Sequence, residues 1–179
     1  MDGGRVRPAC PGEGCGFIHY GDYSIGAGAV VLRDDRVLLI ERRTGERVWW
    51  QIPGGYVESD EAIGDAVERE VLEETGVSAQ LIDVVGFRHA AALLDRPVAN
   101  IYVVFRLEAI AGDPRPDGVE SHRAAFVGRD ALDGVTGLSA ESRWAVETAF
   151  ANREARGLLL RSGEEPTRPG RSVFGLTFP

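Results

Sequence analysis

The chain has 179 residues, of which 44% are hydrophobic, and this is enough to bury a substantial core within one domain. Its apolar runs are far shorter than a membrane span and its first residues lack the apolar stretch of a secretory signal, so we expect a cytoplasmic protein that does not enter a membrane. The formal net charge of −8 argues against a dedicated nucleic-acid binder, and all 20 basic residues are arginine, which excludes lysine-based catalysis.

Residues 1–22 are expected to form an extension before the domain, and they hold both cysteines. Cys10 and Cys15, followed by glycine, are typical of one half of a zinc site. Four residues separate them rather than two, no second pair follows, and only His19 offers a third ligand. We therefore expect a remnant of a zinc site rather than bound structural Zn²⁺, and no disulfide in a reducing cytosol.

The domain is expected over residues 23–158, beginning with two apolar runs, Ser24–Leu32 and Arg36–Glu41, that predict a β-hairpin. A further strand, Trp49–Ile52, leads into a proline and two glycines, and such a turn lets backbone atoms approach a ligand or a metal closely. Trp49 is a candidate for stacking against a base, because strand alternation directs one of two adjacent tryptophans outward.

The next segment, Asp60–Thr75, predicts a helix, with Ser59 as its N-cap and Gly76 as the glycine that ends it. Residues 58–74 contain eight acids and one arginine, a net charge of −7 out of the −8 of the whole chain. Such a concentration of like charge costs repulsion, which a divalent cation would offset.

Helical phase separates these acids into two groups. Glu61, Asp65 and Glu68 fall on an outer stripe that needs only solvent. The other group, Glu70, Glu73 and Glu74, falls within the arc of the apolar side chains, and carboxylates directed at the body of a domain must be paired or bound to metal.

The rest of the chain predicts a mixed sheet between two helices, an α/β/α sandwich. Strands are expected at Ala79–His89, Ala99–Ile110 and Ala124–Val127, and a second amphipathic helix at Ala140–Arg156. Residues 159–179 form a tail that we expect to be extended from about Arg161, although its apolar residues could dock on the domain: Val173, Phe174 and Phe178.

The segment Gly55–Val77 resembles the Nudix box. That signature is glycine, five residues, glutamate, seven residues, then Arg-Glu, an apolar residue, any residue, Glu-Glu, any residue, glycine and an apolar residue. Every fixed position is matched: Gly55, Glu61, Arg69, Glu70, Val71, Glu73, Glu74, Gly76 and Val77. The resemblance implies the Nudix fold and metal-dependent hydrolysis of a nucleoside diphosphate linked to another group. The first 22 residues also resemble half of the zinc ribbon found in some Nudix pyrophosphatases.

By resemblance, Mg²⁺ or Mn²⁺ is held by Glu70, Glu73 and Glu74 with a backbone oxygen of the Gly54–Gly55 turn. These are hard oxygen ligands that suit such ions. The general base stays open among the box glutamates, with Glu73 as one candidate. Arg69 is expected to orient a glutamate, and Glu61 to be structural. Glu120, in the loop before Ala124–Val127, is a candidate for the further glutamate that many family members carry.

Substrate identity is less determined. Arg42 and Arg88 are candidates for phosphate contacts, and the substrate is expected to be a small nucleotide derivative, with ADP-ribose or a dinucleotide such as FAD favoured. A nucleoside triphosphate and a non-catalytic nucleotide sensor stay open, as does a homodimer. An isopentenyl-diphosphate isomerase is disfavoured because both cysteines precede the domain, and a plain Ca²⁺-binding protein because no Asp-rich calcium loop occurs.

Overall fold

The structure is a computed structural model that describes residues 6–95, 97–155, 157–160 and 174–175. Its centre is a seven-stranded mixed sheet with the main order β3-β2-β1-β6-β5, in which β4 also pairs with β1 and β7 with β2. The strands are β1 (Tyr23–Arg33), β2 (Arg36–Thr44), β3 (Arg47–Gln51), β4 (Gly54–Tyr56), β5 (Ser78–Ala90), β6 (Ala99–Ala111) and β7 (Arg123–Gly128). Strands β1 and β6 run parallel, whereas the other pairs are antiparallel.

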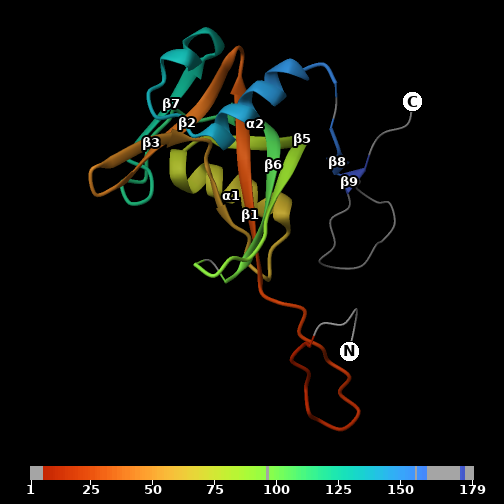
Figure 1. The fold of residues 1–179 in the computed structure, drawn as a ribbon. Helices are drawn as coiled ribbons and strands as arrows, with labels where there is room; N and C mark the ends of the chain where they lie inside the picture. The colour runs from red at the N-terminus through yellow and green to blue at the C-terminus, as the bar shows by residue number, and fades with distance from the viewer. Residues whose placement is uncertain (1–5, 96, 156, 161–173, 176–179) are drawn as a thin grey trace.

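Helices cover both faces of this sheet (Figure 1). Alternate residues of β1 and β2 point to opposite sides, as a pleated strand requires. Val30 packs with α2 (Ala140–Ala151), whereas Val31 packs with α1 (Ile63–Thr75). The predicted α/β/α sandwich is therefore confirmed. No helix within the described residues is long and apolar enough to cross a membrane.

The sheet forks between β1 and β2, and this fork positions the site. The two strands pair with each other at Leu32 and Arg33. Farther along, β3 takes the place beside β2, and β4 takes the place beside β1 at Gly26–Gly28. The link between β3 and β4 consequently crosses the fork, where the carbonyl of Pro53 accepts a hydrogen bond from Ala29 N at 2.9 Å.

Both helices are shorter than predicted. Helix α1 begins at Ile63 with Ala62 as its N-cap, so the predicted start at Asp60 with a Ser59 cap is wrong. The reason is a turn before the helix, in which the Glu61 carboxylate accepts a hydrogen bond from Glu58 N at 2.9 Å. The predicted end at Gly76 is confirmed: this glycine is left-handed, with φ 67°, and its N–H bonds to Leu72 O at 2.8 Å.

Helix α2 ends at Ala151 rather than at residue 156, because a buried arginine donates hydrogen bonds to the backbone carbonyls that follow the helix. Arg106 donates to the carbonyls of Asn152, Arg153 and Ala155 at 2.9, 3.3 and 2.9 Å. Four short elements were not predicted: β4, where only a glycine turn was expected, the 3₁₀ helix η1 (Arg129–Gly134), β8 (Leu159–Leu160) and β9 (Phe174–Gly175).

The two ends of the chain differ in their contact with the core. Phe174 packs against Phe105, with ring centroids 5.6 Å apart, whereas Val173 and Phe178 lie outside the described residues. Toward the N-terminus, an isolated bridge joins Ala9 to Ile18, and both Cys10 and Cys15 are exposed free thiols.

Candidate active site

The last turn of α1 places a buried carboxylate against the glycine turn. Glu74 is 2% exposed, and its Oε2 accepts a hydrogen bond from Gly54 N at 2.7 Å. Its Oε1 forms an ion pair with the guanidinium of Arg42 on β2. Burial raises the pKa of Glu74 to about 7, even though the positive charge of Arg42 and the Gly54 N–H act in the opposite direction. This carboxylate is therefore poorly solvated and would be stabilised further by a cation.

A second carboxylate, that of Glu70, lies directly against Gly55 and occupies the place of a Cβ. A Cβ at Gly55 would lie 2.5 Å from the carboxyl carbon of Glu70. Burial also raises the pKa of Glu70, and the neighbouring charges of Glu73 and Glu120 add to this effect. The turn thus carries one inward carboxylate beside each of its two glycines, one turn of α1 apart.

Arg69 binds three carboxylates at the edge of the site. Its Nη2 and Nε bind both oxygens of Glu61 at 2.8 and 3.1 Å, and its Nη1 lies 3.0 Å from both Glu70 and Glu73. The bidentate geometry with Glu61 fixes the guanidinium. Arg69 thereby holds Glu70 toward the turn. Glu61 supports the site by fixing Arg69, instead of pointing only to solvent.

Two predictions from helical phase are wrong in part. Among the three outer acids, Glu61 is paired with Arg69, and Glu68 accepts a hydrogen bond from Leu81 N at 2.8 Å, so only Asp65 is left to solvent. Among the three inward acids, Glu73 is instead exposed, with 59% of its side chain accessible. The buried face at the end of α1 is narrow and is taken by Val71, Glu74 and Thr75.

A loop before β7 brings Glu120 to the same place. Its Oε2 lies 2.9 Å from Arg42 Nη1, so that Arg42 bridges Glu120 and Glu74. Asp117 shapes the loop by accepting hydrogen bonds from the backbone N–H groups of residues 119, 120 and 121. Ser121, fully buried, donates from its hydroxyl to Glu74 O at 2.6 Å. The loop is therefore tied directly to the end of α1.

Replacing Ser121 with alanine is expected to destabilise the fold by about 1–3 kcal/mol, because the buried carbonyl of Glu74 loses its partner. The same change should loosen the position of Glu120 and reduce turnover. Urea unfolding and steady-state kinetics measure the two effects. Ser78→Ala, at an exposed serine, is the matched control. Equal stability and turnover in both variants would argue against this link.

Glu70 and Glu120 border an open cleft of about 630 Å³, whereas Glu73 and Glu74 are not among the residues that line it. Residues predicted from the sequence that line it are Arg42, Gly55, Glu70, Arg88 and Glu120. The structure does not bring Trp49 to this cleft. Its indole Nε1 donates to Gln51 Oε1 at 2.7 Å, and the Arg47 guanidinium lies 5.3 Å from its ring centre.

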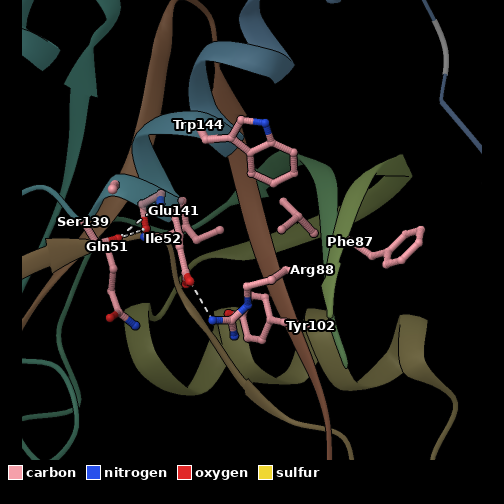
Figure 2. Close-up of a pocket in the computed structure, with 11 residues that line it drawn as sticks. Gln51, Ile52, Phe87, Arg88, Tyr102, Ser139, Glu141 and Trp144 are labelled. Carbon is pink, nitrogen blue, oxygen red and sulfur yellow. Dashed lines mark hydrogen bonds and ion pairs between the residues drawn. The ribbon is translucent and has the colours of Figure 1, made fainter. Parts of the chain in front are cut away.

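A neighbouring pocket of about 560 Å³ lies under the N-terminus of α2, and Figure 2 shows the side chains around it. Trp144 projects from α2 toward β5, where a Cβ at Gly86 would lie 2.9 Å from its ring. Below it, Glu141 reaches across to Arg88, with Oε1 2.6 Å from Nη1. Arg88 and Tyr102 border both the pocket and the cleft, which therefore adjoin each other.

The pocket residues come from four separate segments: β3, β5, β6 and the start of α2. Sequence reasoning did not identify Phe87, Tyr102, Glu141 or Trp144 as site residues, and Trp144 is 45% exposed although it lies on an amphipathic helix. The start of α2 is tied to β3, because Ile52 N donates to Ser142 Oγ at 3.0 Å and Ser139 N to Trp50 O at 2.9 Å. No local signal in the sequence indicates this contact.

The oxygen donors beside the glycine turn are the kind that hard divalent cations prefer. Glu70 and Glu74 are poorly solvated carboxylates on one side, and the carbonyl of Gly54, 3.4 Å from Arg42 Nη2, lies on the other. Across the described ranges, no three His, Cys, Asp or Glu side chains converge on one point as they stand. Arg42 and Arg69 occupy the space between the carboxylates, so binding of an ion would require Arg42 to move away from Glu74.

Replacing Gly55 with alanine is expected to lower activity more than stability. The added Cβ meets only the flexible end of Glu70, which can turn away and so leave the site. Since the resemblance implies that Glu70 is a metal ligand, the expected loss of turnover is roughly 10- to 100-fold. Gly64→Ala in α1, where the nearest atom is 3.7 Å away, serves as control in the same kinetic and thermal-unfolding assays. Wild-type turnover of Gly55→Ala would contradict the contact.

Comparisons with known proteins agree with this arrangement. A family model described as "NUDIX domain" matches residues 22–147. The chain is 28% identical over 109 residues to Nudix hydrolase 5 of Arabidopsis thaliana, a match that covers 59% of this chain and 36% of that protein. It is 30% identical over 104 residues to an ADP-ribose pyrophosphatase of Methanocaldococcus jannaschii, a match that covers 58% of this chain and 60% of that protein. The chain thus spans less than two thirds of these curated relatives.

Among solved structures, a NUDIX hydrolase from Nitrosomonas europaea is similar, with a TM-score of 0.65 and 25% identity over 80% of this chain and all of that chain. The family match spans well over half of the sequence and contains every residue of the box. The chain therefore belongs to the Nudix hydrolase family.

Proposed function

We propose that this chain uses Mg²⁺ or Mn²⁺ to hydrolyse a pyrophosphate bond in a nucleoside diphosphate linked to another group. The observation that carries the proposal is the pair of poorly solvated carboxylates against the Gly54–Gly55 turn: Glu74 binds Gly54 N, and Glu70 lies against Gly55 and lines an open cleft. A site that concentrates negative charge in this way suits a substrate whose own charge is compensated by a divalent cation.

Each residue has a role in this proposal. Glu70 and Glu74 hold the cation with the backbone of the turn, and Glu73 and Glu120 complete the acidic rim. When bound, the cation polarises a P–O bond and lowers the pKa of an attacking water. Glu120 and Glu73 are the accessible carboxylates that can take the proton of that water, because both are about 60% exposed. Arg42, once released from Glu74, supplies positive charge for a phosphate.

The two adjoining cavities fit a substrate with two parts. The cleft takes the charged diphosphate, and the pocket beneath α2 takes the nucleoside, because its lining combines apolar and aromatic side chains with a few polar groups. ADP-ribose is the first candidate, supported by the name of the Methanocaldococcus jannaschii relative.

The cytoplasmic location and the homodimer stay predictions.

A substrate panel tests the proposal: ADP-ribose, FAD, NADH, diadenosine polyphosphates, sugar nucleotides and nucleoside triphosphates, each assayed with Mg²⁺, with Mn²⁺ and with EDTA. We expect cleavage of at least one nucleoside diphosphate derivative, with release of a nucleoside monophosphate, only when metal is present. Preference for nucleoside triphosphates would support the alternative substrate class. Failure to cleave any compound would contradict the proposed function and favour a nucleotide-binding role without catalysis.

A further inference from the structure

One tyrosine stands where the cleft and the pocket meet. Tyr102 lines both cavities. On β6 it pairs with Gly26 of the parallel strand β1 on one side and with Arg88 of β5 on the other. A ligand that occupies both cavities therefore has to pass along this side chain.

Three glycines make room for the ring of Tyr102. A Cβ at Gly26 would lie 2.6 Å from Cδ2 of the ring, and a Cβ at Gly28 would lie 2.4 Å from the hydroxyl oxygen. At Gly54 the added atom would lie 2.8 Å from the same hydroxyl. Real Cβ atoms do not approach this closely, so the three glycines form a slot that directs the hydroxyl to the glycine turn. The turn is the one whose N–H binds Glu74.

The hydroxyl at the end of this slot has no partner of its own. It forms no hydrogen bond with any residue that the structure describes. Burial and the nearby Glu74 carboxylate raise the pKa of Tyr102, so the hydroxyl keeps its proton and stays a donor. Because Tyr102 lines both cavities, a ligand or a water in them can accept this hydrogen bond.

The surroundings of the hydroxyl identify the kind of acceptor. The Arg88 guanidinium lies 5.4 Å from the centre of the ring, and Arg42 lines the same cleft. The Nε atoms of both arginines are buried and also lack a partner among the described residues. Two arginines thus flank the hydroxyl between the acidic turn and the nucleoside pocket, and their positive charge favours an anionic oxygen, as on a phosphate, as its acceptor.

We propose that the Tyr102 hydroxyl donates a hydrogen bond to the phosphate nearest the nucleoside and thereby sets which phosphate reaches Glu70 and Glu74. This inference rests on the proposed function, since it places a nucleoside diphosphate across the two cavities. Tyr102 then fixes the position of the substrate between the two cavities. The nucleoside lies on one side of the ring and the scissile bond on the other.

Calorimetric titration with α,β-methylene-ADP and Mg²⁺ tests the inference on the full chain. Tyr102→Phe keeps the ring and removes only the hydroxyl, so the fold is retained, which thermal unfolding checks. We expect the dissociation constant to rise roughly 10- to 100-fold, the effect of losing a hydrogen bond to a charged group. Tyr23→Phe, at an exposed tyrosine of β1, is the matched control and should bind like the wild type.

The outcomes separate this inference from the proposed function. Wild-type affinity of Tyr102→Phe, equal losses in both variants, or no binding of the analogue by the wild type would each overturn it. Weaker binding by Tyr102→Phe alone supports the inference, even if the substrate panel shows no hydrolysis and the proposed function fails. Conversely, the wild type could hydrolyse a nucleoside diphosphate derivative while Tyr102→Phe binds the analogue normally. That result would support the proposed function and overturn this inference.

Discussion

Replacing Glu74 with glutamine is expected to lower metal-dependent hydrolysis roughly a thousandfold, the upper range for removing one preorganised electrostatic group from an active site. Glutamine has the same shape and can still accept the hydrogen bond from Gly54 N, but it carries no charge. Because Glu74 is only 2% exposed, no solvent replaces the lost negative charge there. Steady-state assays of nucleoside monophosphate release with saturating Mg²⁺ measure the change.

The control for this prediction lies on the same helix. Asp65→Asn also removes one negative charge, but from the solvent-exposed side of α1. We expect it to keep wild-type turnover, and we expect both variants to unfold near the wild-type temperature. A Glu74→Gln protein with full activity, or equal losses in the two variants, would show that net charge rather than the position of Glu74 governs the reaction.

The largest effect on stability is expected from Arg106→Met. Arg106 is 7% exposed and forms an ion pair with Asp83, which is 1% exposed. Breaking a buried ion pair from one side costs about 3–5 kcal/mol, because the remaining charge has no compensation. The change would also release the carbonyls after α2 that Arg106 holds. Urea unfolding should reveal a correspondingly lower midpoint.

Two further variants sharpen this test. The double variant Asp83→Leu/Arg106→Met removes both charges and should recover part of the lost free energy of unfolding. Arg143→Met breaks a pair with Asp133, whose side chain is 96% exposed, and should cost no more than about 1 kcal/mol. A loss for Arg106→Met as small as that for Arg143→Met would show that the buried pair does not stabilise the fold.

The layers of the fold follow from the sequence because they depend on local periodicity. Alternation along residues 24–32 sends Val30 and Val31 to opposite faces of the sheet, and the structure places a helix against each. The 3.6-residue period of the acidic helix likewise predicted its buried apolar side, with Val67 and Val71 in the core. A glycine after the last turn correctly marked its end.

Predictions failed where a contact comes from elsewhere in the chain. The start of α1 is set by Arg69 and Glu58, which take both oxygens of Glu61 and hold the preceding residues in a turn. The outward position of Glu73 depends on how much of the last helical turn the sheet covers, and a helical wheel does not contain that information. Leu72, next to Glu73, is 50% exposed, so the sheet does not cover this side of the last turn of α1.

The candidate site also has one part that the sequence predicts and another part that only the folded structure brings together. The Nudix box places its acids within one turn and one helix, so a local signature is enough to find them. The nucleoside pocket needs β3, β5, β6 and α2 to meet, through contacts such as Arg88 with Glu141, which lie 53 residues apart. The slot around Tyr102 needs glycines from two strands that pair only in the folded sheet.

The central claim is that the buried end of the acidic helix forms a divalent-cation site, and Mn²⁺ binding tests it without relying on any substrate. Free Mn²⁺ is measured by electron paramagnetic resonance during titration of the wild type and of Glu74→Gln. We expect saturable Mn²⁺ binding by the wild type and an Mn²⁺ affinity lower by roughly 10-fold or more in Glu74→Gln. Equal binding by both proteins, or no saturable binding by the wild type, would contradict it.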